Sequence, residues 1–252
     1  MKFTIFMAFM LLLCAGSVFA IDMKGLVMYL SFDEGSGTVA KDASGNGNNG
    51  ELKGKVDWVA GEYGKAVKVD AGAAENFVSV KANATLDITD QITFGAWVNI
   101  GAMPDNHCSL ITKADTYMIH MSDWSGKGIE MEPLLWPFDA WQTPASVPIP
   151  LNEWHHVIGT FDGKEIKTYI DGAIKGKRAY AGPIAVTTND VVIGRDSRGC
   201  CAARKATMTI DDAIIFNRAL SDAEVGEIMA GNITPVTPQT HATTLWGQIK
   251  SQ

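Results

Sequence analysis

Three tryptophans stand close together in a stretch that is too rich in proline to be built from strand interiors. Trp124, Trp136 and Trp141 fall between residues 123 and 150, which also hold Pro133, Pro137, Pro144, Pro148 and Pro150. Proline cannot donate to a sheet ladder, so this segment is predicted to be an elaborated surface loop. Indole rings exposed on such a loop stack on sugar faces or anchor protein interfaces, whereas rings turned inward would only pin the loop. The sequence leaves both interpretations of the tryptophans open.

A second group of side chains has the chemistry of a cation site. Residues 42–50 read DASGNGNNG, in which eight of nine residues are Gly, Asn, Asp or Ser. Such a turn cannot bury a core, and it offers the carbonyl and amide oxygens that calcium binds. The spacing is not that of an EF-hand, and an ordinary glycine-rich turn is the alternative. Asp211 and Asp212 interrupt an apolar strand, where acids need a cation or several donors.

Three cysteines follow the first twenty residues: Cys108, Cys200 and Cys201. In an exported protein a disulfide is permitted, and Cys108 paired with either Cys200 or Cys201 would join two loops. Three reduced thiols are the alternative. Zinc is excluded because neither a C-x-x-C pair nor a histidine at ligand spacing is present.

The strands that must position these groups are clearest between Trp154 and Gly172. Apolar and polar residues roughly alternate up to Phe161, Asp162-Gly163 supplies a hairpin turn, and Asp171-Gly172 supplies the next. Further short strands are expected at 25–32, 66–70, 77–80, 92–100, 110–113, 117–121, 191–195 and 206–216. Ser221 with Glu224 forms a capping box, which predicts one short helix that Gly231 ends. The chain is therefore expected to be an all-β sandwich of antiparallel sheets.

The ends of the chain predict export. Residues 1–20 have a positive start, an apolar centre and a small-residue cleavage site, as in a signal peptide. Residues 21–231 are predicted to form one domain, and residues 232–252 a loosely ordered tail. The net charge of −7 disfavours nucleic acid as a partner. We expect a secreted protein, extracellular or periplasmic, with no transmembrane segment in the mature chain.

Several segments in order resemble the laminin-G-like family of concanavalin A-like jelly rolls. The matching segments are LSFDEGSG at 30–37, Asp42 with SGNGN at 44–48, GKAV at 64–67, FGAWV at 94–98, WHHV at 154–157, YIDG at 169–172, IDD at 210–212 and FNRALS at 216–221. The resemblance implies a jelly-roll β-sandwich of two antiparallel sheets, which usually binds carbohydrate or protein ligands. It also implies a structural calcium ion, held by Asp33 and Asp211 with an oxygen from the loop around Asn48, and less strongly by Asp212.

Enzymes of the same jelly roll set an alternative. Laminarinases and lichenases use an E-x-D-x-x-E strand, and the nearest sequence here, Glu130-Met131-Glu132-Pro133, lacks both the central Asp and the second Glu. His155 and His156 are neighbours on a strand and must point to opposite faces, so they cannot act as a pair. We therefore predict a non-catalytic module for an extracellular glycan or protein surface. A glycoside hydrolase or lyase with unfamiliar catalytic residues and a purely structural adhesion module are the alternatives.

Overall fold

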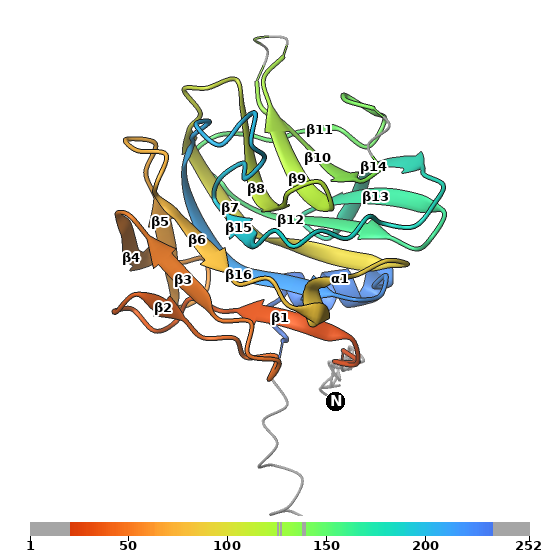
Figure 1. Cartoon of the computed structure of the whole chain (residues 1–252), viewed down its shortest axis with the longest axis horizontal. Helices are drawn as coiled ribbons and strands as arrows, with labels where there is room; N and C mark the ends of the chain where they lie inside the picture. The colour runs from red at the N-terminus through yellow and green to blue at the C-terminus, as the bar shows by residue number, and fades with distance from the viewer. Residues whose placement is uncertain (1–20, 125, 127, 138–139, 234–252) are drawn as a thin grey trace, which may run out of the picture.

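The computed structural model describes residues 21–124, 126, 128–137 and 140–233. The predicted signal peptide and the predicted tail from residue 234 lie outside the described residues. Within them the chain forms two antiparallel sheets that face each other (Figure 1). The predicted all-β jelly-roll sandwich is confirmed.

The first sheet has eight described strands, and its long hairpin is the one expected from the turn dipeptides. Its order is β14 (Ala173–Ala179), β13 (Glu165–Ile170), β12 (Trp154–Phe161), β7 (Ile92–Ala102), β16 (Thr207–Phe216), β5 (Lys65–Val69) and β4 (Val56–Ala60), with β1 (Leu26–Leu30) also pairing with β16. Asp171 and Gly163 both have positive φ, which the hairpin turns require.

The second sheet also has eight described strands. Its order is β11 (Val147–Pro148), β10 (Glu130–Leu135), β9 (Tyr117–Ser122), β8 (His107–Lys113), β15 (Val191–Ile193), β6 (Phe77–Val80), β3 (Gly50–Lys53) and β2 (Val39–Ala40). A single 3-10 turn, η1 (Ala84–Leu86), precedes β7.

The proline-rich segment is more ordered than its sequence predicts, because it contains β10 and β11. Pro133 pairs with Ile119 of β9 on one side, while β11 pairs only with Glu130 and Met131 on the other. The missing N–H of Pro133 therefore falls where β10 has no ladder partner, a position that proline tolerates. The prediction of a loop throughout residues 123–150 was wrong for these two strands.

The main core fills the space between the sheets. Phe94 and Val98 of β7 face Tyr117, Ile119 and Met131 of the second sheet, and all five are buried. The sheets approach closely at Gly159, where an added Cβ would lie 2.7 Å from the Cβ of Pro133. Glycine is needed there because any larger residue would push the two layers apart.

The outer face of the first sheet carries a second apolar cluster. The helix α1 (Asp222–Met229) begins at Ser221 with the predicted capping box, and its Val225 and Ile228 pack on Ile158 and Phe216. Helix and sheet thus seal this face with apolar contacts. The outer face of the second sheet has no comparable cover of described helix, so its polar residues are the first place to look for a site.

Candidate ligand-binding site

The three predicted tryptophans gather over the outer face of the second sheet. Trp124 lies edge-on to His107 (ring centroids 4.2 Å apart), and Trp141 lies against His120 (4.7 Å). His107 and His120 are themselves stacked at 5.5 Å and so join the two tryptophans. We call Trp124, Trp136 and Trp141 with these two histidines the aromatic cluster.

Two tryptophans of the aromatic cluster are open to solvent. Trp124 is 53% exposed and Trp141 is 37% exposed, although buried aromatic residues are the rule. Of the two interpretations of the tryptophan-rich segment, these two rings therefore fit the surface platform. Trp136, which is half-buried, joins through Arg198, whose guanidinium carbon lies 5.9 Å from its ring and 4.9 Å from that of Trp141.

A buried polar row lies directly beneath the platform. Ser109 of β8, His120 of β9 and Glu132 of β10 are cross-strand partners, so their side chains project from one face of the sheet. All three are at most 1% exposed. Neither Ser109 Oγ nor His120 Nδ1 has a hydrogen-bond partner in the structure. These are two of several buried polar atoms in the described residues that have no protein partner, and water or a ligand group can satisfy such atoms.

Burial disfavours the charged forms of His120 and Glu132 in the polar row. Burial and the nearby charge of Arg198 lower the pKa of His120 to about 3, so its ring is neutral at physiological pH. Burial raises the pKa of Glu132, while N–H donors from Thr143 and Gln142 oppose that shift. His120 Nδ1 and Glu132 Oε1 are 4.0 Å apart, too far for a hydrogen bond.

The disulfide differs from the predicted one. Cys200 is bonded to its neighbour Cys201, and Cys108 remains a free thiol. Cys108 faces the core from β8, where burial raises its pKa to about 12 and makes it unreactive. Its Sγ donates to the carbonyl of Arg204 at 3.8 Å instead of bonding either cysteine. The predicted link between Cys108 and Cys200 or Cys201 was therefore wrong.

The predicted cation ligands are only partly brought together. We call Asp33, Asp211 and Asp212 the carboxylate cluster, and charge repulsion within it contributes to the raised pKa of Asp211 and of Asp212. Burial together with Asp212 raises the pKa of Asp211 to about 8, and burial raises that of Asp212 to about 6. None of the described ion pairs includes any of the three.

Backbone donors occupy part of this cluster. Tyr63 N–H donates to Asp211 Oδ2 (3.0 Å), Lys65 N–H donates to Asp33 Oδ1 (2.9 Å), and the Tyr29 hydroxyl donates to Asp212 Oδ1 (2.7 Å). Both oxygens of Asp211 are used, because Asp212 N–H donates to Oδ1. Oδ2 of Asp33 and Oδ2 of Asp212 receive no described hydrogen bond.

Asn48 lies apart from the carboxylate cluster. Its amide group contacts Val27, Asn83 and Thr85, and its N–H donates to Asp42, whose carboxylate organises the glycine-rich loop. Its hydrogen bonds therefore do not join it to Asp33 or Asp211, as the predicted ligand set requires. Among the described residues no group of three or more His, Cys, Asp or Glu is placed to hold a metal ion.

Most of the residues considered for catalysis have hydrogen-bond partners. His155 Nδ1 pairs with Asp171 (2.9 Å), whereas His156 is fully buried against Trp97 and neither of its ring nitrogens has a hydrogen-bond partner. Glu130 accepts a hydrogen bond from Ser146, and Glu132 is held by residues 142 and 143. Trp97, which packs against His156, is only 8% exposed.

The chain belongs to the concanavalin A-like lectin/glucanases superfamily of laminin G type, whose sequence profile matches residues 72–226, more than half of its length. No curated protein matches it in sequence.

Solved structures similar to the chain include several binding domains. The binding domain of Paraclostridial Mosquitocidal Protein 1 is 18% identical with a TM-score of 0.64, covering 83% of this chain and 52% of that domain. Domain 4 of AbnA, an extracellular arabinanase of Geobacillus stearothermophilus in complex with arabinotriose, is 18% identical with a TM-score of 0.62, covering 81% of this chain and 98% of that one. Trypanosoma rangeli sialidase is 17% identical with a TM-score of 0.55, covering 81% and 32%. The chain spans about half of the first of these, and the likeness establishes the fold.

In the described part of the chain, no helix has the length and apolar character that crossing a membrane requires.

His107, His120 and Arg198 were not identified from the sequence as parts of the site. The signal for the histidines was present in the alternation of β8 and β9, where they stand two positions from Ser109 and Ser122 among core residues. What the sequence does not reveal is the register that places them beside one another. Arg198 lies in an irregular loop whose path no periodicity predicts.

Proposed function

We propose that this protein is a secreted, non-catalytic module that binds an extracellular carbohydrate on the aromatic cluster. The observation that carries the proposal is the pair of exposed indoles, Trp124 and Trp141, linked through two stacked histidines above the polar row. Carbohydrate is favoured over a protein surface because the platform combines aromatic faces with buried polar atoms that lack partners.

The relation to known structures supports a binding role. The structure of the AbnA domain was determined with arabinotriose, and the neighbours include receptor-binding domains of toxins. These similarities fix no ligand for this chain. They are consistent with the absence of the laminarinase motif and with the structural roles of His155 and His156.

Calcium is a separate part of the proposal. Asp211 and Asp212 are buried acidic side chains with no described cationic partner, so they are costly to keep ionised, and a divalent cation would offset that cost. Asp33 and Asp212 would hold it through oxygens that no described hydrogen bond occupies, whereas Asn48 is engaged elsewhere. The fit is partial, so calcium is proposed as a stabilising ion and has no part in ligand binding.

The binding proposal is tested with Trp141→Ala on an array of neutral and acidic oligosaccharides. Loss of one stacking ring is expected to weaken binding about tenfold, which is about 1.4 kcal/mol. Trp141→Phe keeps a ring and should retain most of the affinity. Leu151→Ala, which truncates a side chain 41% exposed elsewhere on the surface, should change nothing. Equal binding by Trp141→Ala and the parent protein, or release of reducing ends from the glycans, would refute the proposal.

A further inference from the structure

Hydrogen bonds between its own residues hold the loop that follows β15. Asp196, fully buried, accepts from Arg198 Nε (3.0 Å) and from its second guanidinium nitrogen (2.6 Å). Cys201 N–H donates to the carbonyl of Arg198, and Arg204 N–H donates to the carbonyl of Cys201. The Cys200–Cys201 bond thus lies between two arginines whose backbones both contact Cys201. We call residues 195–205 the arginine loop.

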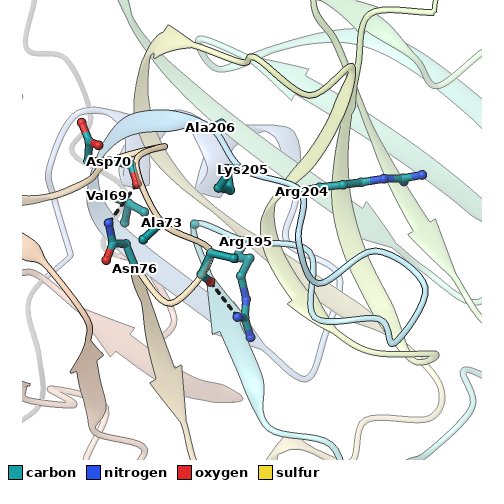
Figure 2. A pocket seen from close by; sticks show the side chains of 10 residues that line it. Val69, Asp70, Ala73, Asn76, Arg195, Arg204, Lys205 and Ala206 are labelled. Carbon is teal, nitrogen blue, oxygen red and sulfur yellow. Dashed lines mark hydrogen bonds between the residues drawn. The ribbon is translucent and has the colours of Figure 1, made fainter.

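The two arginines of this loop that flank the disulfide differ in their partners. The guanidinium of Arg198 forms a salt bridge with Asp196. Among the described residues, no carboxylate pairs with Arg204 and no acceptor bonds its guanidinium. Figure 2 shows its side chain extending away from Arg195 and Lys205, whereas Arg195 turns back to the carbonyl of Ala74.

Arg204 is placed beside the aromatic cluster. The carbonyl of Arg204 accepts a hydrogen bond from the thiol of Cys108, which directly follows His107 in β8. The N–H of Lys205, the residue after Arg204, donates to Asp105 just before that strand. Burial is the main cause of the lowered pKa of His107 and of His120, and the charge of Arg204 adds to the lowering in both. On a chain of net charge −7, a cation without a described partner beside the strand that carries His107 departs from the overall balance.

We infer that the saccharide bound by the aromatic cluster is acidic, and that its anionic group is bound by Arg204, which the disulfide-braced arginine loop holds in place. The inference rests on the proposed carbohydrate function. A guanidinium presents paired N–H donors that match a carboxylate in two-point geometry, so a uronic acid is the fitting chemical class. A neutral sugar would leave this cation without a partner.

The experiment compares matched glycans by calorimetry on the full chain. The probes are oligogalacturonate, the same oligosaccharide with its carboxylates reduced to alcohols, and a sulfated oligosaccharide that supplies anions of other geometry. The parent protein should bind the uronate at least tenfold more tightly than its reduced form, and this ratio should fall as salt is added. Arg204→Gln should bring the ratio close to one, through loss of affinity for the uronate.

Lys68→Gln is the matched control, because it removes the same charge from an exposed position on β5 of the other sheet. It should keep the tenfold preference. If the reduced glycan binds as well as the uronate, or if Arg204→Gln keeps the preference, the acidic-ligand inference is wrong although the platform stands. Equal gains from uronate and sulfate would overturn the carboxylate assignment. If no probe binds and the array of neutral and acidic oligosaccharides shows no binding either, the proposed function itself fails.

Discussion

His120 gives the sharpest test of the electrostatics of the polar row. Its imidazole is 1% exposed, and its pKa is lowered to about 3, mainly by burial. The unfolded chain regains the ordinary value near 6.5. A histidine whose pKa is lower in the folded protein contributes stability that is complete above pH 6.5 and is lost as the pH falls from 6.5 towards 3.

The magnitude follows from the width of this window. Each pH unit within it costs the folded state about 1.4 kcal/mol, so between pH 6.5 and pH 5.0 the loss is about 2 kcal/mol. His120→Gln removes the titrating group but keeps a polar side chain of similar size. The free energy of unfolding of this variant, relative to the parent, should therefore rise by about 2 kcal/mol when the pH is lowered from 7.5 to 5.0.

Urea unfolding at the two pH values measures this difference, and titrations of other groups cancel between the two proteins. His107→Gln provides a graded comparison, because His107 is more exposed and its pKa is lowered by burial and by Arg204. It should show the same sign and a smaller effect. If the parent and His120→Gln lose stability in parallel, the imidazole is not buried as described, and the platform above it must be open.

Two further predictions concern the disulfide and the carboxylate cluster. Replacing Cys200 and Cys201 together by serine should weaken glycan binding severalfold in calorimetry, because the turn that links Arg198 to Arg204 loses its covalent constraint. Cys108→Ser, which alters a buried thiol, should instead lower the melting temperature. Unchanged binding by the double variant would show that the disulfide does not support the site. In chelator, the free energy of unfolding of Asp212→Asn relative to the parent should rise by up to about 3 kcal/mol as the pH rises from 3.8 to about 6. The reason is that the parent must ionise a carboxyl whose pKa is raised in the folded protein. Asparagine tolerates the left-handed backbone there (φ 48°), and added calcium should raise the melting temperature of the parent but not of Asp212→Asn; no response of the parent to calcium would remove the ion from the proposal.

Local signals predicted much of the fold. Asp162-Gly163 marked a hairpin because tight turns need positive φ, and Ser221 with Glu224 marked the start of α1 because two backbone donors are capped reciprocally. These signals act over a few residues, so a sequence displays them directly. The loop prediction around Pro133 was wrong because β10 tolerates this proline only where β11 no longer pairs with it. That is a property of the sheet and not of the segment.

The site was predictable only in its most conspicuous members. Trp124 and Trp141 stood out as candidates because they lie in a proline-rich stretch, but the sequence left open whether their rings are exposed or turned inward. Their joining through His107 and His120 depends on the pairing of β8 with β9, which alternation alone does not fix. The cysteine pairing failed for a related reason, since three cysteines allow several connections and only the fold decides which side chains meet.

The two outer faces of the sandwich explain why binding is assigned to the second sheet. On the first sheet, α1 covers Ile158 and Phe216 with apolar contacts, so opening that face would expose hydrophobic surface and destabilise the fold. On the second, the cover consists of loops. Ser109 and His120 beneath them hold buried polar atoms without protein partners, as Trp97 and His156 do on the first sheet, so the lighter cover is what distinguishes this face. A polyhydroxylated ligand that displaces part of this cover therefore costs little apolar burial and satisfies groups that the protein alone leaves unbonded, which is the energetic condition for a binding face.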